Sequence, residues 1–227
     1  MPEPADTPDA APTAPAPPPA ARVRATGLGH RFPGTDDLFT GLDFELVPGE
    51  VVAVCGPSGC GKSTLLSILA GWLAPARGTV EATGIGRTSW VFQNPYGVAR
   101  RTALDHAVLP LLARGWRRAD AERRAAEVLA EFRLAEAAHR PFRELSGGEA
   151  QRLMLARSVC TAPDLLLVDE PTAQLDRRTA ATVNASLDAI GRAGTIVVIA
   201  THDPHTRAAC TRVLDLGPPV PEPGDAA

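Results

Sequence analysis

The chain has 227 residues, with 23 basic and 26 acidic side chains and a formal net charge of −3. This length suits one domain with a full hydrophobic core, or at most two small domains. The net negative charge comes from the two ends of the chain, because five acids and no base lie before residue 22 and after residue 216. The segment between them is close to neutral, so the composition argues against nucleic acid as a partner.

The sequence contains no candidate membrane span or secretory leader. No run approaches the roughly 18 apolar residues of a spanning helix, and the first residues lack the charged start and apolar stretch of a signal peptide. We therefore expect a cytoplasmic chain that reaches the inner face of the membrane only through a partner. The four cysteines lack the spacing of zinc ligands or of a disulfide framework, so ordinary buried thiols are expected. They are Cys55, Cys60, Cys160 and Cys210.

Both ends of the chain are predicted to be disordered. The first 21 residues contain eight prolines, seven alanines and no aromatic residue. Such a segment buries too little apolar area to fold and favours polyproline-like conformations. Residues 217–227 have the same character. One folded domain is therefore expected over residues 22–216.

The folded part is expected to begin with two edge strands, at 22–28 and 42–46, followed by a buried strand at 50–55. A glycine-rich loop then opens a helix over about 62–71, and short strands are expected at 79–82 and 88–92. Apolar residues spaced by three and four positions predict helical structure from about 102 to 134. The remaining predicted elements are a helix from Ser146, a strand at 165–168, a helix at 177–190 and strands at 195–200 and 213–216.

Apolar strands that alternate with helices predict an α/β fold with a mostly parallel sheet. In this arrangement the helical stretch from about 95 to 158 is an inserted subdomain.

Residues 56–63 fit the phosphate-loop pattern GxxxxGK[ST] between a predicted strand and a predicted helix. Glycines in such a loop let backbone N–H groups turn inward around an anion, and the helix dipole adds to this attraction. Lys62 is the only lysine in the chain, and we expect it to bridge β- and γ-phosphate oxygens, which a wide guanidinium would overfill. The alternative is a glycine-rich turn without a ligand. The residues expected at the nucleotide are Gly56, Pro57, Ser58, Gly59, Cys60, Gly61, Lys62, Ser63 and Thr64.

A buried strand is expected to end in two adjacent acids, Asp169 and Glu170. Carboxylates at such a position are poorly solvated unless they meet a cation. Asp169, together with Ser63, is therefore a candidate Mg²⁺ residue, and Glu170 is the candidate general base that polarises the attacking water. The alternative is a solvated strand end.

Residues 145–152, Leu-Ser-Gly-Gly-Glu-Ala-Gln-Arg, form a capping box in which Ser146 and Glu149 satisfy each other's backbone. Two glycines in the first turn weaken a helix, a cost that indicates close approach of a ligand to the backbone. Together with the phosphate loop and the Asp-Glu pair, this segment resembles the signature motif of ATP-binding cassette (ABC) proteins. The resemblance covers residues 22–216 and implies a P-loop NTPase with a mostly parallel core sheet, a small antiparallel β-subdomain and an inserted helical subdomain.

The resemblance also assigns roles to single residues. Gln93 matches the Q-loop glutamine that touches Mg²⁺ and the attacking water, and Asp176 matches the D-loop. His202 matches the switch histidine that contacts the γ-phosphate, and Asp203 with Pro204 independently predicts a helix start. Phe32 falls where the family stacks an aromatic ring on adenine, with an ordinary core phenylalanine as the alternative.

In the family, the ATP on one protomer is completed by the signature helix of another. Here that helix start comprises Ser146, Gly147, Gly148 and Glu149, and its N-terminus suits the γ-phosphate. The resemblance therefore implies ATP hydrolysis by a homodimer or by a pair with another ABC subunit.

A transporter also requires a separate transmembrane permease. Residues 107–115 are similar to the lipoprotein-release and macrolide-export ATPases (the LolD/MacB type), although residues 91–95 also resemble importers of the energy-coupling type. The alternative function is a non-transport ABC regulator, such as the cell-division ATPase FtsE, or a soluble assembly factor.

Overall fold

The computed structural model describes residues 20–173 and 175–217. Most of the N-terminal arm and of the C-terminal tail, both predicted to be disordered, lies outside these residues. Within them, five strands form one parallel sheet in the order β5-β6-β7-β3-β8. This result confirms the predicted α/β class. The strands are β3 (Val51–Cys55), β5 (Thr88–Val91), β6 (Leu165–Asp169), β7 (Ile196–Ala200) and β8 (Arg212–Asp215).

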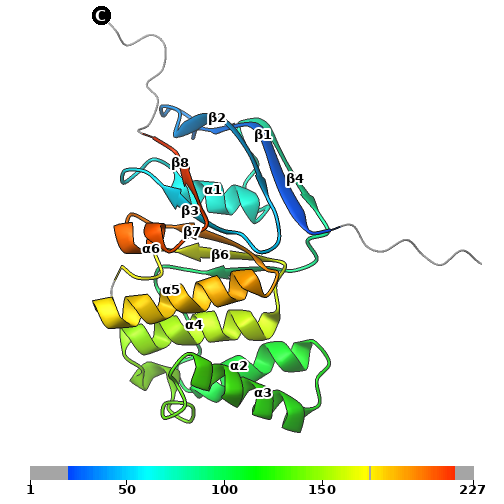
Figure 1. Ribbon diagram of the computed structural model, residues 1–227, viewed down its shortest axis with the longest axis vertical. Coiled ribbons are helices and arrows are strands. Elements are labelled where there is room, and N and C mark those ends of the chain that lie inside the picture. The colour runs from blue at the N-terminus through cyan, green and yellow to red at the C-terminus, as the bar shows by residue number, and fades with distance from the viewer. Residues whose placement is uncertain (1–19, 174, 218–227) are drawn as a thin grey trace, which may run out of the picture.

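The three central strands are apolar on both faces. All five residues of β3 and of β7 are buried, as are the first four of β6. Helices cover both faces of the sheet, as Figure 1 shows, with α1 (Lys62–Leu69) above it and α4 (Gly147–Thr161) and α5 (Arg177–Arg192) below. Apolar runs on both faces are typical of strands covered in this way, which is why the sequence predicted these three strands.

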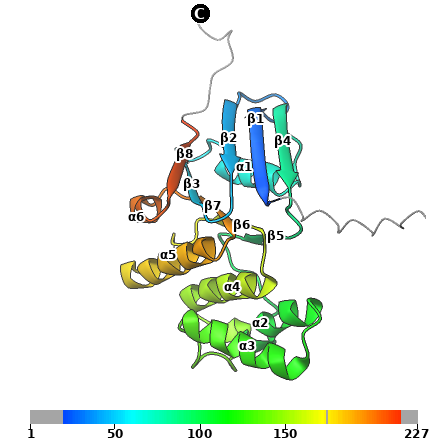
Figure 2. The same cartoon turned by 45° about the vertical axis from the view of Figure 1, so that its right-hand side comes forward.

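A second, antiparallel sheet packs over α1. Its strands are β1 (Arg22–His30), β2 (Phe39–Leu46) and β4 (Arg77–Thr83), in the order β2-β1-β4 (Figures 1 and 2). The prediction that the first strand lies at an edge was wrong, since β1 is central and pairs on both sides. Val23 lies opposite Leu46 in β2 and opposite Ala82 in β4. The pairing with β4 joins residues about fifty to sixty positions apart in the sequence, which no local pattern reveals.

The predicted helical region between 102 and 134 is divided into α2 (Ala103–Ala113) and α3 (Arg118–Glu131). The break lies at Gly115, whose φ of 86° a helix cannot contain. A short 3₁₀ turn at Phe142–Glu144 leads into α4. One cluster of buried side chains continues from α2 and α3 through α4 to the lower face of the sheet, so the helical part is packed onto the sheet rather than hinged away from it.

The last helix, α6 (Pro204–Ala208), begins as the Asp203-Pro204 pair predicted, with Asp203 as its cap. Within the described part of the chain, no helix combines the length and apolar character needed to cross a bilayer.

Candidate functional site

A cavity of about 690 Å³ lies where the carboxyl ends of β3 and β6 and the loop after β7 meet. In an open parallel sheet, this edge is the usual location of a ligand. Most of the residues predicted from the sequence lie here. The cavity is lined by Phe32, Leu38, Gly56, Pro57, Ser58, Gly59, Gly61, Lys62, Ser63, Thr64, Gln93, Asp169, Glu170 and His202.

The phosphate loop joins β3 to α1 and needs glycine for two different reasons. Gly61 caps α1 with φ 94°, and a Cβ there would lie 2.9 Å from a ring carbon of Phe39. A Cβ at Gly56 would lie 2.5 Å from the Cys60 sulfur. Both contacts are shorter than any side chain allows, so the loop can close over the start of α1 only with glycine at these positions. The free N–H groups of that helix end then face the cavity.

Lys62 is folded back into the loop. Its Nζ donates hydrogen bonds to the carbonyl oxygens of Gly56 at 2.9 Å and Pro57 at 3.0 Å. The side chain thus holds the ammonium beside the loop amides. A bound phosphate would offer the ammonium stronger, charged acceptors in place of these two carbonyls.

Cys60 differs from the other loop residues predicted at the nucleotide. Its side chain is fully buried beneath the loop, and it does not line the cavity. Its backbone N–H donates to the Pro57 carbonyl at 3.3 Å. The thiol therefore belongs to the core under the loop. Cys55 and Cys160 are buried as predicted, whereas Cys210 is only half-buried, so the prediction of a buried thiol was wrong at that position.

Asp169 lies at the end of β6 and accepts a hydrogen bond from the Ser63 side chain. Burial and the neighbouring Glu170 carboxylate raise the pKa of Asp169, while the Ser63 hydrogen bond and the Lys62 charge act in the opposite direction. A carboxylate whose ionised form is poorly solvated gains from a nearby divalent cation. An oxygen pair of this kind suits Mg²⁺, which takes few protein ligands and keeps bound water or phosphate for the rest.

Glu170 and His202 form a pair at the cavity wall. The His202 Nδ1 lies 2.7 Å from Oε1 of Glu170, and the Thr201 hydroxyl donates to Oε2 at 3.5 Å. The Glu170 side chain is 11% exposed, whereas that of His202 is 69% exposed. Glu170 also has a φ of 45°, a conformation that costs energy for a residue with a side chain and is concentrated at functional sites. The carboxylate is held in place, while the imidazole is accessible to a ligand.

Two further predicted residues line the cavity. Phe32 is 44% exposed and meets the buried His30 ring edge to face at 5.0 Å. It is therefore not a core phenylalanine, which was the alternative interpretation. Gln93 follows β5 and is exposed.

The predicted signature residues lie outside this cavity. Ser146 caps α4 and accepts from the Glu149 N–H at 3.3 Å, while Glu149 accepts from the Ser146 N–H at 2.7 Å. Arg140 adds an ion pair to Glu149 at 2.9 Å. Burial raises the pKa of Glu149, but the hydrogen bonds from Ser146 and the charge of Arg140 outweigh burial and leave that pKa below its usual value. The capping box is thus present as predicted.

Asp176 caps the neighbouring helix α5, and its carboxylate accepts from the N–H groups of Arg178 and Thr179 at 3.0 Å each. The two helix starts are adjacent, because a Cβ on Gly148 would lie 3.1 Å from the Leu175 side chain. Apart from the buried Cys60, the structure therefore sorts the predicted residues into two groups. One lines the cavity, and the other is gathered at the starts of α4 and α5.

The sequence missed two residues of the site. Leu38, which lies in the turn before β2, lines the cavity with Phe32. Thr201 is buried and donates a hydrogen bond to Glu170 from outside the cavity lining. A single leucine in a turn carries no recognisable pattern. Thr201 had one available signal, its place between a buried strand and His202.

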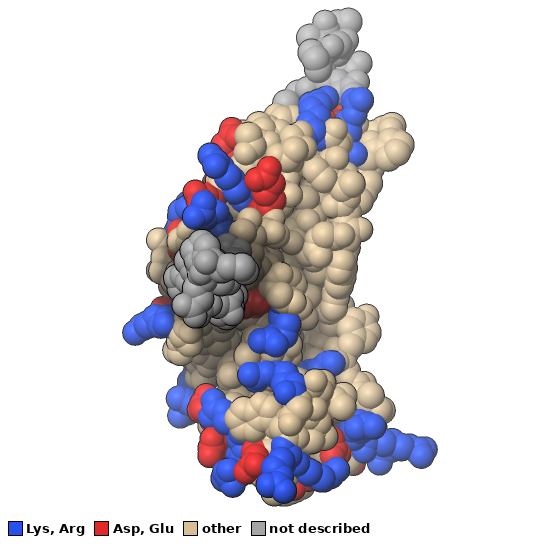
Figure 3. All heavy atoms as spheres, turned by 90° about the vertical axis from the view of Figure 1, so that its right-hand side faces the viewer, with Lys and Arg blue, Asp and Glu red and all other residues tan. Residues whose placement is uncertain are grey.

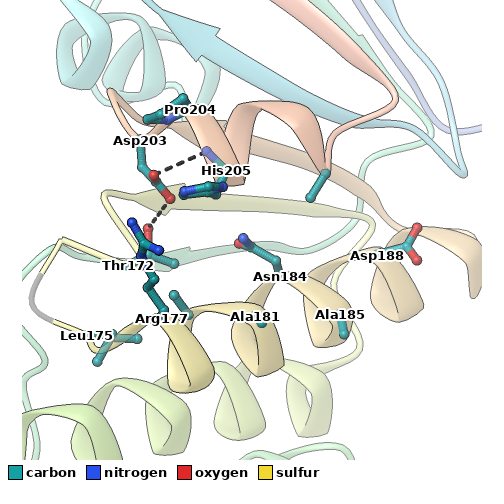
Figure 4. Close-up of a pocket in the computed structure, with 12 residues that line it drawn as sticks. Thr172, Leu175, Arg177, Ala181, Asn184, Ala185, Asp188, Asp203, Pro204 and His205 are labelled. Atoms are coloured by element: carbon teal, nitrogen blue, oxygen red, sulfur yellow. Dashed lines mark hydrogen bonds between the residues drawn. The ribbon is translucent and has the colours of Figure 1, made fainter.

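A larger hollow of about 840 Å³ lies between α5 and α6 (Figure 4). Both of its acidic side chains already have partners. Asp188 pairs with Arg192, and Asp203 accepts from the N–H groups of His205 and Thr206 and from the hydroxyls of Thr206 and Thr172. Burial raises the pKa of Asp203, but these hydrogen bonds outweigh burial and lower it. The network holds α6 to the loop after β6, which is a structural role.

Comparison with known proteins identifies the family. A family model described as ABC transporter matches residues 39–173. This range includes the phosphate loop, Gln93, the signature residues and the Asp-Glu pair, whereas Phe32, Asp176 and His202 lie outside it.

Relatives that match about four fifths of this chain agree. A lipoprotein-releasing system ATP-binding protein, LolD, of Paramagnetospirillum magneticum is 40% identical over 81% of this chain and 89% of its own length. An uncharacterised ABC transporter ATP-binding protein of Mycobacterium bovis is 38% identical over 78% of this chain, which spans only 58% of that relative's length. The predicted similarity to lipoprotein-release ATPases is confirmed by such matches.

Among solved structures, a dimeric ATP-binding cassette in a post-hydrolysis state with ADP and Pi is similar, with a TM-score of 0.74 and 27% identity. The match covers 86% of this chain and 94% of that one. The fold, the motifs and these relatives lead to one conclusion: the chain belongs to the ABC transporter family of ATP-binding proteins.

Proposed function

We propose that this chain is the ATP-hydrolysing subunit of an ABC transporter. The observation that carries the proposal is the pairing of Glu170 with His202 opposite the phosphate loop in one cavity. A loop that binds phosphate and a carboxylate that can accept a proton from water are the two parts that hydrolysis of a phosphoanhydride needs.

The cavity suits ATP in both size and polarity. Its volume of about 690 Å³ falls within the usual range for small-molecule sites. Phe32 offers an exposed ring for the adenine base. Lys62 and the N-terminus of α1 supply positive charge for the phosphates.

Ser63 and Asp169, with Gln93 nearby, are the residues that would hold Mg²⁺. When bound, the ion would neutralise charge on the phosphate oxygens. Within the described residues there is no cluster of three or more acidic, histidine or cysteine side chains that could hold a metal. A single serine–aspartate pair suits an ion that also takes ligands from the nucleotide.

Glu170 acts as the general base in this proposal. Its hydrogen bonds with Thr201 and His202 fix the carboxylate, and a fixed carboxylate can orient and deprotonate a water molecule. His202 is the more exposed partner and is free to turn its ring toward the γ-phosphate.

The second group of residues completes the site from another chain. Ser146 and the glycines after it present a helix N-terminus with unpaired N–H groups, yet none of them lines the cavity of their own chain. We therefore propose that two copies, or one copy and a related subunit, close head to tail around two ATP molecules. Closure and reopening would then drive the membrane partner.

The partner proposed is a separate transmembrane permease, which would hold the chain at the inner face of the membrane. The LolD relatives, which match over most of their length, favour export of the lipoprotein-release type. The proposed machinery of ATP hydrolysis does not depend on this choice of cargo.

The test is the variant Glu170→Gln. The amide keeps the size of the side chain and loses its basicity, so the turnover rate should fall by about 10²–10⁴-fold while ATP binding persists. Hydrolysis is measured as phosphate release and binding by calorimetry. A variant that hydrolyses ATP at the wild-type rate would show that Glu170 is not the base.

A further inference from the structure

An aromatic groove, distinct from the nucleotide cavity, lies along the outer edge of the parallel sheet. Trp72 stacks on Trp90 with ring centroids 4.8 Å apart, and Trp90 stacks on Phe92 at 5.1 Å. With Tyr96 and Pro95 these rings line a hollow of about 400 Å³. We call this surface the aromatic groove.

The rings of the groove are unusually exposed. Trp72 is 66% and Tyr96 73% exposed. Clustered exposed aromatic rings indicate a binding surface rather than a solvent face.

The chain itself carries a segment of the matching chemistry. Residues 12–18 read Pro-Thr-Ala-Pro-Ala-Pro-Pro and contain two overlapping PxxP patterns. Proline-rich segments of this kind adopt polyproline II and dock into grooves lined by aromatic rings. The flat proline rings can pack against the exposed rings of the groove, and the segment contains no charged side chain that would have to be desolvated.

The tether length permits the contact within one molecule. Arg22 pairs with Thr83 across β1 and β4, and Trp90 follows Thr83 by seven residues, so the distance from Arg22 to Trp90 is at most about 30 Å. The start of β1 and strand β5 lie next to each other in Figures 1 and 2. The run from Pro12 to Pro18 precedes Arg22 by four to ten residues, or about 12–31 Å of polyproline II.

The charges also match. Arg157 lines the groove, which contains no acidic side chain, and Arg157 makes no ion pair within the described part of the chain. Figure 3 faces the side on which β1 begins, and basic side chains lie across the middle of that surface. The segment before the proline run carries Glu3, Asp6 and Asp9 and no base, so it would be attracted to this surface.

From these observations we infer that the N-terminal arm is a ligand of its own domain: residues 12–18 dock in the aromatic groove, with the acids before them near Arg157. Phe92 and Pro95 belong to the groove, whereas Gln93 between them lines the nucleotide cavity. The docked arm would therefore brace the Gln93 segment from outside. If the chain powers a permease, as proposed above, the arm would also compete with a partner segment for this surface.

The test is ¹⁹F NMR of the full-length chain labelled with 5-fluorotryptophan, without nucleotide or partner, so that its outcome does not depend on the proposed function. The chain has three tryptophans, and Trp116, on the α2–α3 turn beside Arg114, is the internal reference. Signals are assigned with Trp→Phe variants. Replacing Pro12, Pro15 and Pro18 by serine should shift the Trp72 and Trp90 signals and leave Trp116 unchanged.

The matched control replaces three prolines of the other end, Pro218, Pro219 and Pro221, by serine. That end leaves the sheet from β8, the edge opposite β5, so the control should move no signal. Unchanged Trp72 and Trp90 signals in the first variant would overturn the inference. So would a shift in the control alone, or a wild-type signal position that changes with protein concentration, which would assign the contact to the arm of a second copy.

Discussion

The Lys62 ammonium lies against two loop carbonyls in a chain whose other 22 basic residues are all arginines. A compact ammonium on a flexible stem can exchange these carbonyls for phosphate oxygens without moving the loop. A planar guanidinium is wider and less compact than an ammonium, so it would not replace Lys62 between these two carbonyls without displacing them. The identity of the cation, and not only its charge, is therefore expected to matter.

Lys62→Arg should lower kcat/KM for ATP by about a hundred-fold, because displacing a phosphate-binding charge by about 1 Å has effects of that size. The measurement is steady-state phosphate release. Arg118→Lys is the control, since its ion pair with Glu122 is exposed and such pairs contribute little. Equal rates for wild type and Lys62→Arg would mean that the lysine has no special role.

Asp169 is expected to trade stability for function. Because its pKa is raised in the folded chain, the folded state binds the proton more tightly than the unfolded state does. Below the pKa that Asp169 has in the unfolded chain, its protonated form contributes its full stabilisation of the folded state. This contribution is lost as the pH rises through the higher pKa that Asp169 has in the folded chain. At neutral pH the ionised carboxylate destabilises the nucleotide-free protein.

Asp169→Asn should therefore raise Tm at pH 7.5 by about 2 °C, the change for somewhat under 1 kcal/mol in a domain of this size, with partial solvent screening taken into account. The gain should shrink toward pH 4.5, and Mg²⁺-dependent hydrolysis should be lost. Thermal unfolding at both pH values, with the exposed Asp36→Asn as control, tests this. A lower Tm at pH 7.5 would contradict the assigned origin of the pKa.

Two helices of this chain, α2 and α4, start with the same kind of capping box. In α2, Thr102 accepts from the Asp105 N–H at 3.1 Å, and Asp105 accepts from the Thr102 N–H at 3.0 Å. Ser146 and Glu149 make the same exchange in α4. We propose that only the α4 box also contacts the nucleotide of a second chain. Comparing variants of the two boxes therefore distinguishes an effect on stability from an effect on ATP hydrolysis.

Ser146→Ala and Thr102→Ala should each cost about 1 kcal/mol, which lowers Tm by about 2–4 °C. Only Ser146→Ala should also lower the ATPase rate, by about ten-fold or more, because it removes a donor aimed at the phosphate. Thermal unfolding and phosphate release on both variants decide this. Equal loss of activity in the two would assign Ser146 a structural role only.

At this scale the sequence predicted much of the fold. Strands β3, β6 and β7 were predictable because they are apolar on both faces, and the start of α4 because Ser146 and Glu149 form a local motif. The position of β1 was not, since its second neighbour comes from a distant segment. Leu38 and Thr201 were missed because their roles arise only from where the fold places them.

The whole molecule holds one phosphate loop and one signature helix, on different surfaces. The cavity opens beside Glu170 and His202, whereas Ser146 lies next to the start of α5. A single copy therefore presents two half-sites. We propose that the phosphate-loop cavity of each chain meets the signature helix of its partner.

Mixing two inactive variants tests this claim most directly. Glu170→Gln keeps the signature helix, and Ser146→Arg keeps the cavity, so a mixed dimer contains one intact site and one doubly altered site. Each variant alone should be nearly inactive. An equimolar mixture, combined before ATP is added, should recover about a quarter of the wild-type phosphate release, because half of the dimers are mixed and each has one site of two. A mixture whose rate equals the mean of the separate rates at every ratio would contradict a site shared between two chains.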